Sequence, residues 1–245
     1  MEINRAFRST TKILLGQELG PVEEYHGFLS RYIDLPVETK SILSGKPVYL
    51  AAETKKKIIS NEEMSKLSLP SVSINEIKDI DSLFHAVQEN FHHAGNKIGG
   101  QFKEINRSDE CYDVYFINNC LNVYETQYAS NCQMMKDTKY VFGCAWGVEN
   151  TFGINTNEFY KVSRVFESTM VLHSNDVYYS YNCRNCHDVM FCMNQRSKRN
   201  AIGNNELSKE KYFELKKKLL SEICDLLIRK KTAPGHMDLF QGVNE

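Results

Sequence analysis

The sequence predicts a mainly β protein: a single-stranded β-helix (solenoid) with a 12-residue repeat, an α/β cap at the N-terminus and a helix at the C-terminus. The first observation behind this prediction is a small residue at every twelfth position in the middle of the chain: Ser108, Cys120, Cys132, Cys144, Thr156, Ser168, Ser180 and Cys192. A fixed period held over so many repeats is typical of a solenoid, in which each repeat buries its core against its neighbours.

The second observation is that every third residue of this region is small or apolar. An apolar series runs three residues out of step with the first: Cys111, Ile117, Val123, Ala129, Met135, Val141, Gly147, Gly153, Phe159, Val165, Val171, Val177, Cys183 and Val189. An α-helix needs apolar recurrence near 3.6 residues and an isolated strand near 2.0, so neither fits. A coil whose sides are multiples of three residues fits, with one residue of each triplet turned inward. The pattern leaves open the handedness and whether one coil takes twelve or twenty-four residues.

The third observation is the lack of hairpin signals. No proline occurs between Pro70 and Pro234, and no Asn-Gly or Pro-Gly pair occurs in the repeat region. Antiparallel hairpins need turn residues at each reversal of the chain. The pattern therefore disfavours chance alternation in ordinary hairpins.

Residues 1–100 carry no repeat and predict the α/β cap. Pro21 in a first helical turn predicts a helix up to Tyr32, and residues 48–52 predict a short strand. Ser60 is a helix start, and a second amphipathic helix is expected from Ile80 to Phe91. Its inward residues would be Ile80, Leu83, Phe84, Val87 and Phe91. Because an open solenoid end invites edge-to-edge growth, we expect this block to close the first coil.

The remaining boundaries follow from composition. The glycine-rich stretch 94–102 predicts the start of the solenoid, which we place at 101–195, followed by an exit segment and helix at 196–231 and an arm at 232–245. Ser208 is a good N-cap for the helix. Its apolar residues recur at helical spacing: Tyr212, Leu215, Leu219, Ile223, Leu226 and Leu227. A helix of about 23 residues, roughly 34 Å long, should lie along the solenoid or pair with another copy.

The formal net charge of −1 hides an uneven distribution. Residues 108–194 contain five basic and ten acidic residues, whereas residues 195–231 contain eleven basic and five acidic residues. The basic extension is therefore expected to fold back on the acidic solenoid or to dock on a neighbouring copy. The first residues lack the apolar core of a secretory signal, and no run of eighteen apolar residues occurs. We expect an intracellular protein, or a virion protein if a phage encodes it, without a membrane partner.

Seven of the eight cysteines lie on the period-three pattern, where a free thiol serves as a small hydrophobe. The best metal candidates are Cys183, Cys186, His187 and Cys192. Structural zinc needs four ligands, and a second Cys or His pair is missing. The pattern also turns these cysteines inward and His187 outward. We therefore expect core packing and no cofactor, and a metal-binding module stays as an alternative.

An enzymatic site is a further alternative. His92 and His93, with Glu104, lie where the cap meets the first coils. The chain has no G-x-S-x-G, H-E-x-x-H or G-x-G-x-x-G motif, so acyl-transfer, metalloprotease and dinucleotide chemistry lack their usual residues. We predict no catalytic residue, and the sequence favours a protein that is not an enzyme.

Outward positions beside the repeat are rich in aromatic residues and predict an interaction surface. These residues are Tyr128, Tyr140, Phe142, Trp146, Phe152, Phe166 and Tyr178. Nucleic acid would also need interleaved Lys and Arg, and this region is acidic, which disfavours it. Monomers rarely expose large apolar stripes, so we expect cover from the N-terminal block, the C-terminal helix or a partner subunit.

The exit from the repeat carries a family resemblance. The run NCRNCHDVMFCMNQRSKRNAIGNNELSKEKYFELKKKL and the S-x-x-V and C-x-x-V repeats before it resemble a group of uncharacterised Cys/Ser/Asn-rich solenoid proteins. These occur in uncultivated bacteria, archaea and their phages, and often carry the misleading label CaiB/BaiF family. The group commonly has an aromatic-Cys-Ile-aromatic-Asn stretch where this chain has residues 200–204, NAIGN. No residue here supports the coenzyme A transfer that the label implies.

These observations together predict a non-enzymatic structural or interaction protein. It would act as a subunit of a larger assembly, with further copies or other protein subunits as partners. The resemblance implies a phage-encoded component as one setting for such an assembly.

Overall fold

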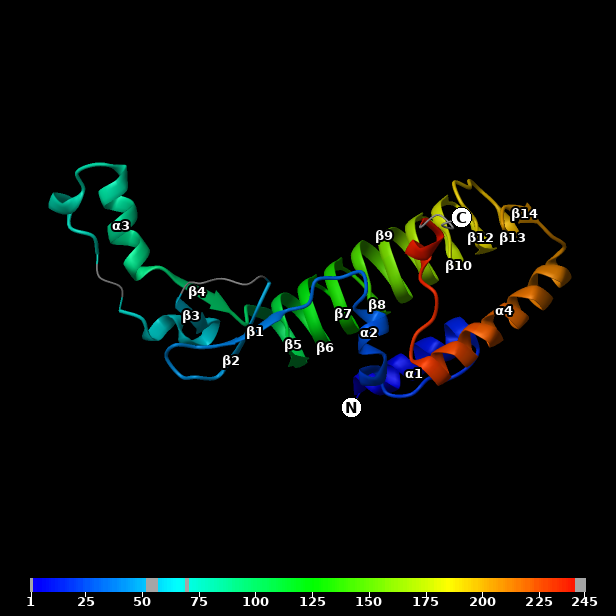
Figure 1. Cartoon of the computed structure of the whole chain (residues 1–245), viewed down its shortest axis with the longest axis horizontal. Coiled ribbons are helices and arrows are strands. Elements are labelled where there is room, and N and C mark those ends of the chain that lie inside the picture. Colours follow the sequence, from blue (N-terminus) through cyan, green and yellow to red (C-terminus); the bar gives the residue numbers. More distant parts are fainter. Residues whose placement is uncertain (1, 52–56, 69–70, 241–245) are drawn as a thin grey trace, which may run out of the picture.

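The computed structural model describes residues 2–51, 57–68 and 71–240, and it confirms the β-solenoid (Figure 1). Successive coils pair in parallel with a register of twelve residues, for example Cys120 with Cys132 and Val123 with Met135. One coil therefore takes twelve residues. The rod has about nine turns.

The rod is formed by nine strands and closed at its far end by a tenth. These are β5 (Ile98–Asn106), β6 (Asp109–Tyr124), β7 (Gln127–Lys136), β8 (Lys139–Phe142), β9 (Ala145–Leu172), β10 (Asn175–Tyr178), β11 (Tyr181–Arg184), β12 (His187–Met190), β13 (Arg199–Ile202) and β14 (Asn205–Glu206). β14 runs antiparallel to β13 and ends the parallel stack. The solenoid thus extends past residue 195, the end predicted from the sequence.

Each coil is four-sided because the backbone turns at every third residue. From Glu104 to Asn200 every third residue has φ between 46° and 63°, with Gly143 at 69° taking the same role. This left-handed conformation is costly for most residues and least so for Asn and Asp, which recur at these corners. In one coil the corners are Tyr140, Gly143, Trp146 and Glu149. The residue after each corner points inward and the next points outward.

The inward residues form four columns along the rod, and the column of small residues satisfies its own polar groups. The backbone N–H of Cys120 donates to Ser108 Oγ at 3.1 Å, and that of Ser180 donates to Ser168 Oγ at 3.0 Å. The thiol of Cys132 donates to the carbonyl oxygen of Val141 at 3.5 Å. A narrow interior is thus filled without stranding backbone groups.

Gly147 stands in a column where neighbouring coils place larger residues. A Cβ added there would lie 2.3 Å from the ring of Phe159, one coil further along. The Phe159 ring therefore occupies the interior space that a side chain at position 147 would need. Gly147, Val148 and Phe159 also line a groove on this side of the rod.

The first 35 residues cover one side of the rod, whereas the prediction placed them at its end. α1 (Glu2–Leu15), η1 (Val22–Tyr25) and α2 (His26–Leu29) pack against the middle coils. The rings of Phe7 and Phe142 meet edge to face with 5.0 Å between centroids, and the Tyr178 hydroxyl donates to the carbonyl of Leu14. The outward side chains of the middle coils are apolar here, and this determines where the helices dock.

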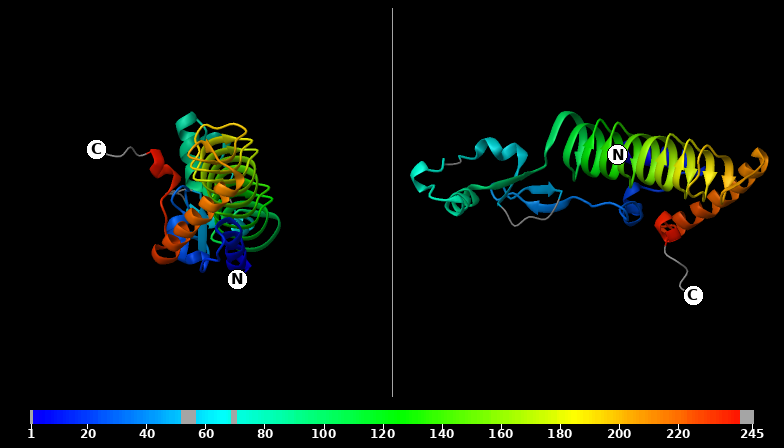
Figure 2. Two further views of the ribbon diagram at one scale, coloured as in Figure 1. Left: turned by 90° about the vertical axis from the view of Figure 1, so that its right-hand side faces the viewer. Right: turned by 90° about the horizontal axis from the view of Figure 1, so that it is seen from above.

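An arm projects beyond the first coil (Figures 1 and 2). It contains β1 (Val37–Lys40), β2 (Pro47–Leu50), β3 (Lys57–Ser60), η2 (Asn61–Lys66), η3 (Ile74–Glu76), α3 (Ile80–Asn90) and β4 (His92–Gly95). Ser60 and Glu63 form a capping box at η2, at the predicted helix start. The predicted strand at 48–52 is β2, and Ala52 lies outside the described residues.

The arm joins the rod through Asn96, whose side-chain oxygen accepts from the Tyr49 N–H at 2.8 Å. It does not bury the first coil, since Phe102 of β5 is 58% exposed. The glycine-rich stretch 94–102, predicted as the start of the solenoid, contains the end of β4 and the first residues of β5.

α4 (Lys209–Lys230) begins after the N-cap Ser208 and folds back along the solenoid (Figure 1). This is one of the two arrangements that were predicted for the helix. Its Lys216 Nζ lies 3.9 Å from Asp176 and 3.6 Å from Asp188, both at corners of the rod. Burial lowers the pKa of Lys216, and the two carboxylates oppose that shift. After α4 the C-terminal arm returns to the rod at η4 (His236–Phe240), and residues 241–245 lie outside the described part.

Candidate interaction surfaces

The seven aromatic residues predicted as an interaction surface lie in three different environments. Tyr128, Tyr140 and Phe152 continue a ladder that starts at Phe116, with one ring per coil at the same corner. Successive ring centroids are 5.0, 4.8 and 5.1 Å apart and the rings are nearly parallel. These rings are half-buried and contact one another, so the ladder stabilises the stack of coils.

Phe142, Phe166 and Tyr178 are at most 1% exposed, because α1, α2 and α4 cover them. The helices of the chain itself therefore provide the cover that was expected for these three residues. These three residues are not open to a partner. Trp146, in contrast, lies at a corner of the rod and is 58% exposed.

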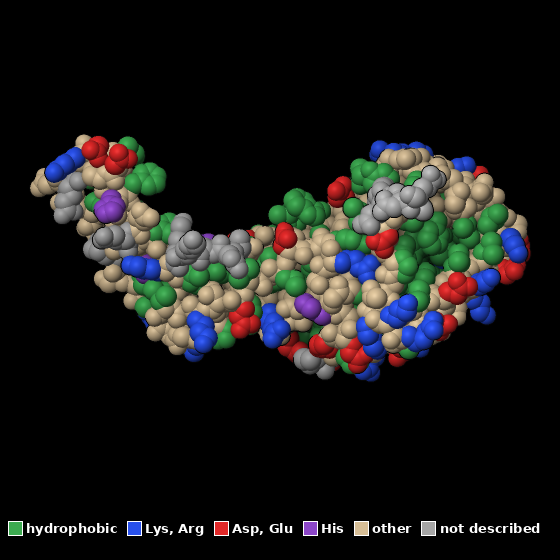
Figure 3. Space-filling model, in the orientation of Figure 1, with side chains coloured by type: hydrophobic (Ala, Val, Ile, Leu, Met, Phe, Trp, Pro, Cys, Tyr) green, Lys and Arg blue, Asp and Glu red, His purple; other side chains and the backbone are tan. Residues whose placement is uncertain are grey.

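α3 carries an exposed apolar face that was expected to be buried. Ile80, Phe84 and Val87 are 65%, 70% and 44% exposed, and Phe91 is 46% exposed. With Leu83 and Gln88 they line a groove of about 520 Å³. Hydrophobic side chains are visible at this end of the arm in Figure 3. The prediction that these residues point inward was wrong, because the arm carries α3 beyond the solenoid core.

The metal candidates lie in separate environments. Cys183, Cys186 and Cys192 are fully buried inside the last coils, where their thiols donate to backbone carbonyls at 3.4 to 3.6 Å. The neighbouring Cys186 sulfur and burial raise the pKa of the Cys183 thiol. His187 points outward, 3.5 Å from the Asn175 side chain. Within 2–51, 57–68 and 71–240, no three His, Cys, Asp or Glu side chains lie close enough together to hold a metal ion.

A thiol titration tests whether the cysteines act as core residues. All eight cysteines are unpaired and buried, so a thiol reagent such as DTNB should react with none of them within minutes in native buffer. It should react with eight per chain in guanidinium chloride, because unfolding exposes the rod interior. Rapid reaction of two or three thiols in the native protein would contradict this packing.

The residues of the alternative enzymatic site do not converge. His92 and His93 lie in β4, paired with Lys57 and Ile58 of β3. Glu104 is an exposed corner of the first coil. A polar cleft of about 730 Å³ between the arm and this coil includes Glu104 among its described lining residues but neither histidine. The three residues therefore do not form one catalytic constellation.

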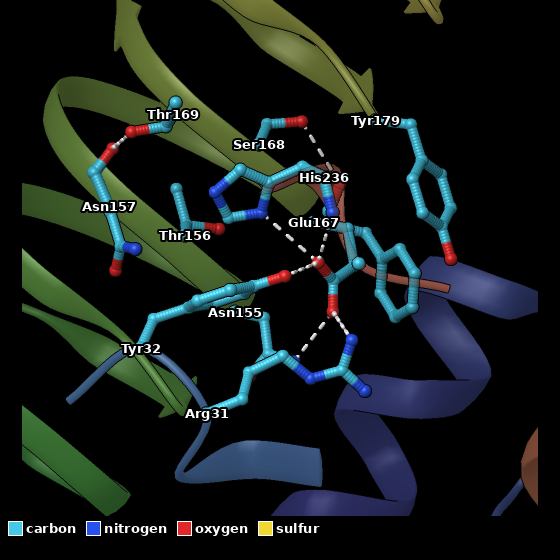
Figure 4. A network of polar contacts seen from close by, with 12 residues as sticks. Arg31, Tyr32, Asn155, Thr156, Asn157, Glu167, Ser168, Thr169, Tyr179 and His236 are labelled. Atoms are coloured by element: carbon cyan, nitrogen blue, oxygen red, sulfur yellow. Dashed lines mark hydrogen bonds and ion pairs between the residues drawn. The ribbon is translucent and has the colours of Figure 1, made fainter. Parts of the chain in front are cut away.

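One buried polar cluster was not anticipated from the sequence (Figure 4). Glu167 is a corner residue of β9 with no exposed surface. Its carboxylate accepts from the Asn155 amide at 2.7 Å, the Tyr32 hydroxyl at 3.2 Å, and both the backbone N–H and Nδ1 of His236 at 3.0 and 3.1 Å. Arg31 lies 3.8 Å away. These partners come from the N-terminal segment, the rod and the C-terminal arm.

The Glu167 cluster acts as a structural clamp. A carboxylate buried in this way is tolerated only when its oxygens are well bonded and an opposite charge is near. Burial, and then the Glu167 charge, raises the pKa of Tyr32 to about 12, so its hydroxyl stays a donor. The cluster thus joins the segment after α2 and the C-terminal arm to the same coil.

Comparisons with known proteins assign no relative to the chain. No protein-family model matches it, and neither does any curated protein. Of the helices described, none is long and apolar enough to cross a membrane.

Proposed function

We propose that this protein is a non-enzymatic structural or interaction subunit of a larger assembly, and that α3 is its contact element. The observation that carries the proposal is the apolar face of α3, where Ile80, Phe84 and Val87 are exposed at the end of the projecting arm. A helix with one apolar stripe normally buries that stripe. An exposed groove of this kind is typical of a site that receives another chain.

The construction of the rod also supports a scaffolding role. The inward columns are filled by close-packed small and aliphatic side chains, and one side is covered by the chain's own helices. Polar clusters such as Glu167 tie the two terminal segments to the rod. Such a close-packed rod suits a spacer between subunits. The resemblance noted above favours a phage particle as one setting for this role.

The proposal predicts that Phe84→Asp weakens association while the fold is kept. Phe84 is the most exposed aromatic residue of α3 at 70%, so its replacement costs little folding stability and places a charge in the apolar contact. Sedimentation velocity of the wild-type chain should show mass that rises with concentration. The Phe84→Asp variant should sediment with a lower mass than the wild type at the same concentration, and its circular dichroism and melting temperature should match the wild type.

A matched control is Phe102→Asp, which removes another exposed aromatic from the first coil. It should associate as the wild type does. A wild-type chain that stays monomeric, and that captures no stable partner from its source cells after cross-linking, would count against the proposed function.

A further inference from the structure

A second apolar surface lies on a side of the solenoid that none of the described helices covers. A groove of about 580 Å³ is lined by Tyr124, Met134, Trp146 and Tyr160, with Gly147 and Val148 among its other lining residues. Trp146, the only tryptophan of the chain, is 58% exposed, and Tyr124 and Tyr160 are 43% and 37% exposed. Trp, Tyr and Met are enriched at the centres of protein interfaces, so this groove is suited to receive a large side chain.

A row of acidic residues borders the groove. Asp113, Glu125, Asp137 and Glu149 occupy the same corner in four successive coils, so neighbours in the row are about 4.8 Å apart along the rod. Lys136 and Lys161 each approach one member at 3.8 Å, and Asp137 is exposed. Like charges at this spacing repel one another and favour a partner with positive charges.

The chain itself carries a surface of the complementary kind on α4. Phe213 is 41% exposed and lies between Lys209 and Lys217, four residues away on either side and therefore on the same face of the helix. Both lysines are exposed. Lys and Arg side chains gather along α4 in Figure 3. An aromatic side chain between two ammonium groups matches an aromatic groove beside an acidic row.

The groove and α4 lie on opposite sides of the four-sided coil. α4 and α1 cover the side that carries Phe142 and Phe166, whereas Val148, in the groove, lies two corners further around the coil. One chain therefore cannot fill its own groove with α4. Two chains that pair once still leave one groove and one α4 face open, which makes the contact heterologous and extendable.

We propose that the groove around Trp146 receives the basic face of α4, centred on Phe213, from a second copy of this chain. This inference rests on the proposed function, because it names the partner and the geometry of the assembly. Successive copies would then stack side by side, with α4 of one copy between the two rods. The α3 face remains available for a different contact of the same assembly.

Mixing two variants tests the proposal. Trp146→Asp disables the groove and keeps α4, whereas Phe213→Asp disables α4 and keeps the groove. Both changes are made in the Phe84→Asp background, so that the α3 contact is absent. Each variant alone should then be monomeric in sedimentation velocity, with association weakened at least about 30-fold, as for a central interface residue. An equimolar mixture should form dimers and no larger species, because each pair has only one intact contact.

Charge variants test the same contact without altering an apolar residue. In the Phe84→Asp background, Glu125→Lys with Asp137→Lys, and separately Lys209→Glu with Lys217→Glu, should each prevent self-association, and the two double variants should bind one another. Association of the wild type should weaken as sodium chloride rises, because exposed charges are screened. Phe102→Asp, with the same 58% exposure as Trp146, is the matched control and should associate normally.

The outcomes separate this inference from the proposed function. If Phe84→Asp abolishes association while Trp146→Asp and Phe213→Asp associate normally, the α3 contact stands and the groove contact is overturned. If instead Trp146→Asp and Phe213→Asp abolish association while Phe84→Asp associates normally, the groove contact stands and the α3 contact is overturned. A mixture of Trp146→Asp and Phe213→Asp that stays monomeric, or a wild-type chain that is monomeric at every concentration, overturns the proposal and leaves the groove to a different partner.

Discussion

Replacing Ser168 with leucine should lower the free energy of unfolding by about 2–6 kcal/mol. Ser168 is fully buried in the small-residue column, between Thr156 and Ser180 of the adjacent coils. A leucine side chain would overpack both neighbours, at a cost of about 1–3 kcal/mol. It would also remove the hydroxyl that accepts from the Ser180 N–H at 3.0 Å, which strands a buried donor at a cost of a further ~1–3 kcal/mol.

Urea unfolding followed by circular dichroism measures this effect. Glu149→Ala is the control, because Glu149 lies on the outside of the rod, where it forms a 3.8 Å ion pair with Lys161. It should change the free energy of unfolding by no more than about 0.5 kcal/mol. If Ser168→Leu unfolds like the wild type while Glu149→Ala is strongly destabilised, the inward and outward positions have been assigned in reverse.

The solenoid could be predicted because each coil repeats one environment every twelve residues. A residue such as Cys144 meets only residues 132 and 156 of its own column, so the constraint on its size is visible as a period in the sequence. The same reasoning identified the buried thiols. The left-handed corners are also visible in the sequence, because Asn and Asp recur just before the inward positions, as at Asp113, Asn119 and Asn122.

The placement of the helices could not be predicted in the same way. The pattern of α3 was recognised correctly as amphipathic, but an apolar stripe indicates only that some surface should cover it. Whether that surface belongs to the same chain depends on where the arm points. The helix α1 itself was predictable from the sequence, since Ile3, Phe7 and Leu14 recur at helical spacing and are all buried.

The Glu167 cluster was beyond sequence reasoning because its partners are distant along the chain. His236 lies 69 positions after Glu167 and Tyr32 lies 135 positions before it. No local spacing relates such residues. The corner column alone is a weak indication that residue 167 is buried and hydrogen-bonded. Its neighbours in that column, Asn155 and Tyr179, are also buried and carry polar groups.

Removing the Glu167 carboxylate should lower the free energy of unfolding by about 3–5 kcal/mol. Glu167→Ala strands the buried donors of Asn155 and His236 and leaves Arg31 without its counter-charge. Breaking a buried, hydrogen-bonded charge cluster from one side costs about 3–5 kcal/mol. Glu158→Ala is the matched control, because Glu158 is also a left-handed corner, with φ of 49° against 46° for Glu167, but is exposed. The free energy of unfolding of the Glu158→Ala variant should lie within about 0.5 kcal/mol of the wild-type value.

The cluster should also couple the C-terminal arm to the rod. In a double-mutant cycle of Glu167→Ala with His236→Ala, the two effects should be less than additive by at least about 1 kcal/mol, because each change removes the same contact. Limited proteolysis should cleave the arm around Ala233 to Asp238 faster in Glu167→Ala than in Glu158→Ala, since the arm loses two hydrogen bonds to the rod. Equal melting and equal cleavage of the two variants would show that the carboxylate does not hold the arm, and that apolar packing alone keeps it in place.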